Sequence, residues 1–244
     1  MRKGEIRRQE ILSVSERLFF ERGYRATTLN DILGEVGCTK GSFYHHFESK
    51  LQVLEEIAEV HVQGWYSHYL AGEYASLPLR LNGLLYHALP FRAGEEGFVS
   101  VLLGLMLQAD GVQLKQRLWD AGKRVFLPEL IRVLGLMRSS GKAFYANPAV
   151  VNLLWEAHMA LIMASAEEAC RQLVSGGFAG SRLVLLLQAA RFQWERLLDL
   201  DYGSMLIIDS AEMLQVLEHA SANVFREDEQ LRFDLSGHNL SSMA

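Results

Sequence analysis

The amino-acid sequence predicts an all-α protein, and three observations on its 244 residues carry this prediction. Apolar residues recur at spacings of three and four along most of the chain, which is the period of an amphipathic helix. No segment shows the alternation of apolar and polar residues that a half-buried strand requires. Only four prolines interrupt these patterns, so long helices are allowed.

Composition indicates a globular, cytoplasmic protein. Half of the residues are hydrophobic, 22% are charged, and the length fits one large domain or two small ones. The two cysteines form no CxxC pair or disulfide framework, so a reducing compartment is expected. The N-terminus MRKGEIRRQE lacks the apolar core of a signal peptide, and the most apolar stretch, residues 98–109, is too short to span a bilayer. We therefore expect no membrane partner.

Charge is unevenly distributed along the chain. Residues 1–50 hold nine Lys/Arg against seven Asp/Glu, and the remaining residues hold fifteen against twenty-two. A locally basic end on an acidic body is compatible with a small nucleic-acid contact at that end.

Three short helical patterns follow one another at this basic end. Residues 5–22 form an amphipathic pattern that stops at Gly23. A capping box of Thr28 and Asp31 opens the second pattern, and Gly34 and Gly37 close it.

The third pattern runs from Lys40 to Phe47, with Thr39 as its N-cap. At about 100° per residue, Phe43 and Phe47 face the core and leave a small, polar and aromatic face outside. Ser49 caps the next helix in a Ser-x-x-Gln box. Lys50 then lies in the first turn, where a cation opposes the helix dipole, and this suggests an anionic partner.

Two short helices joined by a glycine-containing turn form a helix-turn-helix, whose second helix enters the major groove with its N-terminal residues. Gly41 allows close backbone approach, and hydroxyl, ammonium, phenol and imidazole groups nearby can donate to phosphates or base edges. The same helix pair also occurs in proteins that bind no DNA, and both adjacent histidines fit a solvated surface as well. The residues concerned are Thr39, Lys40, Gly41, Ser42, Tyr44, His45 and His46.

Residues 11–54 resemble the tetracycline-repressor (TetR) family of bacterial transcriptional regulators. That family's typical motif has a Thr start, an apolar pair, a Gly-containing turn, a Lys-Gly-x-x-Tyr helix start and a Phe-x-x-Lys exit. Leu33-Gly34 departs from the family, which often has alanine and a polar residue there, and this departure predicts a looser second helix. The matching residues are Thr28, Ile32 with Leu33, Gly37, Lys40 to Tyr44, and Phe47 to Lys50.

The resemblance implies specific DNA contacts, matched position by position. Base-edge contacts are expected from Lys40, Gly41, Ser42 and Tyr44, with His45 or His46 assisting. Phosphate contacts are expected from Thr28, Thr39, Tyr44 and Lys50.

Beyond residue 60 the sequence predicts architecture only. We expect a helix-turn-helix domain over 1–50, a helical regulatory domain over 51–226 and a loose tail over 227–244. The helical segments of the larger domain are 50–75, 79–90, 95–109, 112–138, 147–174, 179–200 and 204–226.

The resemblance assigns this larger domain two roles, ligand binding and homodimerisation. Residues 147–174 and 179–200 are the expected interface, because AHMALIMASAEEA (157–169) is apolar and rich in alanine. The alternative is that these faces bury within one subunit. The scarcity of basic residues at apolar positions favours a neutral or cationic hydrophobic ligand. The side chains expected to line its pocket, each of which also fits plain core, are Trp65, Tyr69, Trp119, Phe126, Trp155 and Met159.

The sequence thus predicts a homodimeric repressor that a small hydrophobic ligand releases from a palindromic DNA operator. The alternative is a helix-turn-helix protein with a structural or cell-cycle role and no effector. We expect no enzyme activity, cofactor or metal, because His61, His68, His87 and His158 form no recognisable catalytic or metal-binding motif.

Overall fold

The computed structural model describes residues 3–106, 112–141, 147–174 and 180–227. Within these ranges all regular secondary structure is α-helical, so the prediction of an all-α fold is confirmed. The helices are α1 (Lys3–Arg22), α2 (Leu29–Val36), α3 (Lys40–His46), α4 (Lys50–Ala71), α5 (Leu77–His87), α6 (Glu96–Met106), α7 (Val112–Ser139), α8 (Pro148–Val174), α9 (Gly180–Leu197) and α10 (Ser210–Glu227).

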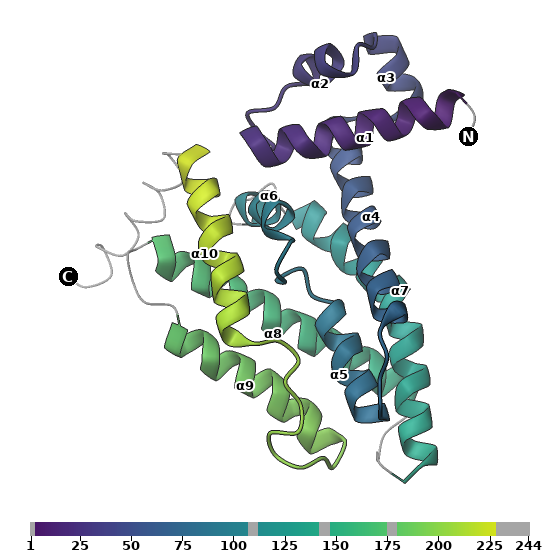
Figure 1. The fold of residues 1–244 in the computed structure, drawn as a ribbon, viewed down its shortest axis with the longest axis vertical. Helices are drawn as coiled ribbons and strands as arrows, with labels where there is room; N and C mark the ends of the chain where they lie inside the picture. Colours follow the sequence, from purple (N-terminus) through teal and green to yellow (C-terminus); the bar gives the residue numbers. More distant parts are fainter. Residues whose placement is uncertain (1–2, 107–111, 142–146, 175–179, 228–244) are drawn as a thin grey trace, which may run out of the picture.

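The helices form two parts of unequal size (Figure 1). α1, α2 and α3 lie together at one end, with α2 and α3 on the side of α1 that faces away from the rest of the chain. α4 leads from them into the larger part, which contains α5 to α10. The expected boundary after residue 50 falls at the start of α4, and the division into independent domains stays a prediction.

The small part is held together by buried apolar side chains, which belong to one apolar core that continues into the larger part. Ile11 and Leu18 of α1 and Ile32 of α2 have no exposed surface. Phe43 is also fully buried, Phe47 is 1% exposed, and their ring centroids lie 5.8 Å apart. The prediction that these two phenylalanines face the core is therefore confirmed, and the remaining face of α3 is left outside.

The larger part is built around aromatic side chains from several helices. Trp155 of α8 stacks on Phe126 of α7 at 6.3 Å between ring centroids, and neither side chain is exposed. Trp194 of α9 donates its indole N–H to Nδ1 of His158 on α8 at 3.1 Å. These contacts hold α7, α8 and α9 side by side.

The last helix begins at Ser210 rather than at residue 204, so the predicted start was wrong. Gly203 and Ile207 have positive φ angles of 81° and 56°, which helical residues do not adopt. The side-chain oxygen of Asn82 accepts hydrogen bonds from the N–H groups of Leu206 and Ile207 at 2.9 and 2.8 Å. This contact with α5 holds the segment before α10 in a non-helical form, and it is invisible in the local sequence.

The expected loose tail, residues 227–244, lies outside the described residues apart from Glu227. Among the described helices, one window, Ala149–Leu173 in α8, is long and apolar enough to cross a membrane. Half of that window is buried inside the protein, as in the core helix of a globular fold.

Substituting Gly97 with alanine should destabilise the contact between α6 and α1. A Cβ at this position would lie 2.8 Å from the ring of Phe20, so the phenylalanine must move. Overpacking of this kind costs about 1–3 kcal/mol. Thermal unfolding should show the loss, and the double variant Gly97→Ala, Phe20→Leu should recover part of it. Unchanged stability in Gly97→Ala would contradict the tight contact.

Candidate nucleic-acid interface

Local capping fixes the positions of α2 and α3. The hydroxyl of Thr28 accepts from the N–H of Asp31 at 3.2 Å, and the Asp31 carboxylate accepts from the N–H of Thr28 at 2.7 Å. Gly37 ends α2 with a left-handed φ of 64°, and the Thr39 hydroxyl caps α3 by accepting from the N–H of Ser42. The caps predicted at Thr28, Gly37 and Thr39 are confirmed. The prediction that Gly34 helps to close α2 was wrong, because the helix continues to Val36.

The cap of α4 differs in one detail. Ser49 accepts from the N–H of Gln52 at 3.1 Å, as predicted. The side-chain oxygen of Gln52, however, accepts from the N–H of Glu48 rather than from that of Ser49. The chain between α3 and α4 is fixed at both ends by these bonds.

The outward face of α3 presents most of the residues that the sequence singled out. Tyr44 is 51% exposed, and its ring meets the edge of Phe43 at 5.5 Å between centroids. The other predicted contact residues divide into an exposed set and a partly buried set. Thr28, Thr39, Lys40, Gly41 and His45 are exposed, and Ser42, His46 and Lys50 are partly buried.

Gly41 is not required by the packing of this chain. A Cβ built at Gly41 would meet nothing closer than the Thr39 hydroxyl at 4.0 Å. The bare backbone at the start of α3 is therefore available to an approaching surface.

The environment of α3 lowers the pKa of His46. Partial burial is the largest cause of the lower pKa, and the nearby side chains of His45, Arg8 and Arg7 lower it further.

Lys50 has an internal partner that the sequence did not reveal. Its ammonium group donates to the carbonyl oxygens of Tyr24 and Thr27 at 2.6 and 2.8 Å and lies 4.2 Å from the centre of the Tyr24 ring. Burial lowers the pKa of Lys50, and the Asp31 carboxylate opposes this shift. These bonds explain a lysine in the first turn of α4 without any anionic partner, and its phosphate contact stays a prediction.

Substituting Lys50 with methionine should lower stability by about 1–3 kcal/mol, because charge-assisted bonds to two carbonyls are lost. The matched substitution Lys40→Met, at an exposed lysine of α3, should leave stability within about 0.5 kcal/mol. Thermal unfolding by circular dichroism measures both. Equal melting temperatures for the two variants would contradict the proposed internal role of Lys50.

The six residues expected to line an effector pocket are not gathered around one described cavity. Trp65, Tyr69, Phe126, Trp155 and Met159 are all at most 7% exposed and pack in the core. Trp119 is half-buried and lines an opening of about 520 Å³ between α7 and α8. The other residues lining that opening are Lys115, Gln116, Asp120, Lys123 and Glu156.

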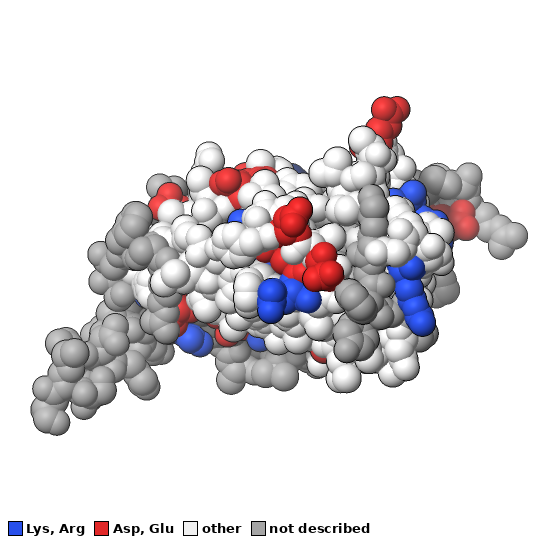
Figure 2. All heavy atoms as spheres, turned by 90° about the horizontal axis from the view of Figure 1, so that it is seen from below, with Lys and Arg blue, Asp and Glu red and all other residues white. Residues whose placement is uncertain are grey.

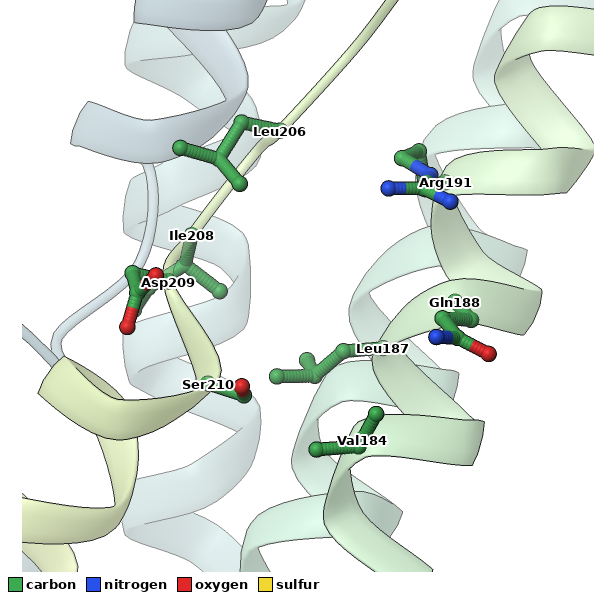
Figure 3. Close-up of a pocket in the computed structure, with 8 residues that line it drawn as sticks. All are labelled: Val184, Leu187, Gln188, Arg191, Leu206, Ile208, Asp209 and Ser210. Carbon is green, nitrogen blue, oxygen red and sulfur yellow. The ribbon is translucent and has the colours of Figure 1, made fainter. Parts of the chain in front are cut away.

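A second described cavity lies between α9 and the segment before α10 (Figure 3). Arg191 and Gln188 line one side, and Leu206, Ile208 and Ser210 line the other. Its volume of about 110 Å³ is below the roughly 300–1,000 Å³ of a small-molecule site. This groove is therefore too small for a drug-sized effector.

The histidines of the larger part have separate surroundings. His158 is fully buried, and burial lowers its pKa to about 4. Burial, and then the Arg92 guanidinium, lower the pKa of His87 to about 4. His61 lies between two glutamates, Glu16 and Glu95, which sequence patterns did not suggest. Within the described ranges, no group of three or more His, Cys, Asp or Glu side chains is arranged to hold a metal ion.

The end of the molecule opposite α3 has a mixed charge. Figure 2 shows this end with basic and acidic side chains scattered among uncharged ones, and no continuous basic area.

Comparison with known proteins connects the N-terminal part to one family. Residues 11–57 match the family model described as bacterial regulatory proteins, tetR family. The transcriptional repressor KstR2 of Rhodococcus jostii is 51% identical over 51 residues, which cover 21% of this chain and 25% of the repressor. KstR2 of Mycobacterium tuberculosis is 38% identical over 80 residues, 32% of this chain and 40% of that protein. The chain thus matches less than half the length of these relatives.

Solved structures extend the similarity in fold to most of the chain. A TetR-family transcriptional regulator from Pectobacterium atrosepticum has a TM-score of 0.56 at 20% identity, covering 80% of this chain and 96% of that one. A structure from Mesorhizobium loti described as tetR-family has a TM-score of 0.50 at 14% identity, covering 94% and 98%. Identities this low support the fold alone. Together with the family match, they lead to one conclusion: residues 11–57 form a DNA-binding domain of the kind found in bacterial regulatory proteins of the tetR family, and most of the chain shares the fold of solved tetR-family structures.

Proposed function

We propose that the protein is a DNA-binding transcriptional repressor that acts as a homodimer on a palindromic operator and leaves it when a small ligand binds. The observation that carries this proposal is the outward face of α3, where Lys40, Gly41, Tyr44 and His45 are exposed. Among the relatives that match this region, the KstR2 proteins are named transcriptional repressors.

The exposed face of α3 has the chemistry of a recognition helix. Lys40 and Ser42 can donate to guanine or phosphate oxygens, and Tyr44 can reach a base edge or a phosphate. Gly41 leaves room for the DNA surface, because intrachain packing does not occupy the space of its missing side chain. A short helix supported by two buried phenylalanines holds these groups in one orientation.

Dimerisation through α8 and α9 is supported by apolar stripes on both helices. Leu153 is 66% exposed, and Ala157, Ala160 and Ala164 continue from it at spacings of four, three and four. On α9, Leu185 and Phe192 are 65% and 48% exposed. Apolar residues at these spacings suit helix packing against a second copy, and small alanines allow close approach.

The opening at Trp119 is the described cavity best suited to an effector. Its volume of about 520 Å³ fits a small molecule, and the indole offers an aromatic face. Lys123 and Trp119 both donate to the Glu156 carboxylate, at 2.5 and 2.6 Å. This mixed lining favours an amphipathic effector with polar groups, whereas the sequence suggested a neutral or cationic hydrophobic ligand.

Binding to DNA should be tested by fluorescence anisotropy with fragments from upstream of the protein's own gene, from low to physiological salt. Specific binding predicts one preferred fragment, a steep salt dependence and preference of roughly 10³-fold or more over random DNA. Equal, weak binding to every upstream fragment and to random DNA would contradict a site-specific regulator acting on its own gene.

The alternative is a structural or cell-cycle DNA-binding protein without an effector. The same anisotropy assay, repeated with a library of small molecules, separates the two, because release requires different ligand affinities for the free and DNA-bound states. A releasing compound whose effect is lost in Trp119→Ala would support the effector site. Insensitivity of the specific complex to the whole library would favour the alternative.

A further inference from the structure

His61 joins three separate elements at the boundary between the small and large parts. Its ring lies on α4, Nε2 is 2.6 Å from Oε1 of Glu16 on α1, and Nδ1 is 2.9 Å from Oε2 of Glu95. Glu95 immediately precedes α6. One side chain therefore bridges the helix-turn-helix part, the connecting helix and the larger part, which meet in this region (Figure 1).

Both ring nitrogens face carboxylate oxygens, and between two ionised glutamates this geometry requires an imidazolium. A neutral imidazole has one N–H and one lone pair, so one of the two contacts would set a lone pair against a carboxylate. With both nitrogens protonated, each donates to one glutamate. The negative charges of the two carboxylates are then neutralised by the positive charges of His61 and Arg92. Nη2 of Arg92 lies 3.6 Å from Oε1 of Glu95.

The surroundings of His61 hold the ring firmly. It stacks on Phe98 at 4.3 Å between ring centroids, and the indole of Trp65 donates to Oε1 of Glu95 at 2.7 Å. The charged groups facing the ring are Glu16 from α1 and Glu95 from the turn before α6, with Arg92 behind Glu95. The ring neighbours on α4 and α6 are aromatic.

The electrostatic balance agrees with this geometry. Burial alone would lower the pKa of His61, but the hydrogen bonds to Glu16 and Glu95 outweigh it and raise the pKa to about 9. For Glu95, burial acts to raise the pKa, and the bonds from His61 and Trp65 bring it below its usual value.

We propose that the His61 imidazolium is a positioning residue that sets the orientation of the helix-turn-helix part by tying α1 to the turn before α6. α4 connects the two parts through a single helix, so contacts of α1 with the larger part decide the angle between them. The ion pair from Arg8 to Glu56, in contrast, joins α1 to α4 and does not reach the turn before α6. The consequence for operator binding rests on the proposed function, whereas the orientation itself can be measured without DNA.

The first test is the titration of the His61 ring, followed by NMR on protein labelled with ¹⁵N at histidine. His61→Gln identifies the signal. The expected midpoint lies near pH 9 rather than at the ordinary value of 6.5. A midpoint at or below 6.5 would overturn the proposal, because the bridge would then be uncharged near neutral pH.

The second test measures the orientation by distances between two spin labels, one on the native Cys38 and one on Leu79→Cys, in a Cys170→Ala background. Cys38 lies between α2 and α3, and Leu79 is an exposed residue of α5. Dilution with unlabelled protein restricts the signal to distances within one chain. We expect a narrow distribution at pH 7 that broadens or shifts as the pH rises through about 9.

His61→Gln and Glu16→Gln should each give the broadened distribution already at pH 7, with no further response to pH. Glu16→Gln retains the contact of His61 with Glu95, so it serves if His61→Gln fails to fold. His68→Gln, at an exposed histidine on the same helix, should behave as the wild type. Identical distributions in wild type and both variants would overturn the proposal. A wild type that shows the pH response but binds no DNA would refute the proposed function and leave this inference standing.

Discussion

Substituting Tyr44 with alanine should abolish specific operator binding while the protein remains folded. Tyr44 is 51% exposed on the outward face of α3, whereas its neighbour Phe43 is fully buried. A lost base-edge or phosphate contact costs about 1–3 kcal/mol at each half-site. Because a homodimer loses the contact twice, the total of about 2–6 kcal/mol corresponds to a decrease in affinity of roughly 30-fold to more than 10⁴-fold.

The effect on folding should be small. The substitution removes the edge-to-face contact of Tyr44 with Phe43, and such aromatic pairs contribute about 0.5–1.5 kcal/mol. Circular dichroism should therefore show a folded protein with a modestly lower melting temperature, while anisotropy shows no specific complex.

The control for Tyr44→Ala is Leu70→Ala. Leu70 is 57% exposed and lies at the end of α4 that is far from α3, outside both apolar stripes. This variant should bind the operator like the wild type. Wild-type affinity in Tyr44→Ala itself would remove the assignment of α3 as the recognition helix.

The part of the fold that the sequence predicted well depends on short-range signals. The capping box of Thr28 and Asp31, the left-handed Gly37 and the Thr39 cap each involve residues within four positions of one another. Their hydrogen bonds join residues that are close in sequence and need no distant partner. The local residue pattern is therefore sufficient to predict these caps. The inward position of Phe43 and Phe47 follows from helix periodicity for the same reason.

The features that the sequence did not predict depend on partners far along the chain. The carbonyls that bind Lys50 are 26 and 23 residues away, and the glutamates that bind His61 are 34 and 45 residues away. No local pattern indicates such pairs, because they exist only when the helices have packed. From the sequence alone, Lys50 is therefore expected to contact only phosphate, and His61 is one of several scattered histidines without a partner pattern.

The candidate effector residues show the same limit. Aromatic and methionine side chains on helices suit a pocket wall and a solid core equally, and composition does not separate the two. Tyr69, Phe126 and Trp155 are fully buried against other side chains, whereas Trp119 borders an opening. Only the packing of α7 against α8 distinguishes Trp119 from the others.

Substituting Leu185 with arginine should convert the proposed dimer to a monomer and thereby remove high-affinity operator binding. Leu185 is 65% exposed in the single chain, so an arginine there is solvated and the fold should tolerate it. In a dimer formed through α9, the same arginine would be buried without a partner, which costs about 3–5 kcal/mol. Because the dimer would bury two such arginines, the total cost of about 6–10 kcal/mol should raise the concentration at which it dissociates by roughly 10⁴-fold to 10⁷-fold.

The matched control is Leu79→Arg, which places the same charge on an exposed leucine of α5, outside both apolar stripes. Analytical ultracentrifugation should show a dimer for the wild type and for Leu79→Arg, and a monomer for Leu185→Arg at the same micromolar concentration. A monomer carries one recognition helix and contacts one half-site, so its DNA affinity should fall as the fraction of dimer falls.

If Leu185→Arg and Ala160→Arg both remain dimeric, the stripes on α8 and α9 are not the interface. If the wild type itself is a monomer, the palindromic operator is also wrong, because nothing then fixes the spacing between two recognition helices.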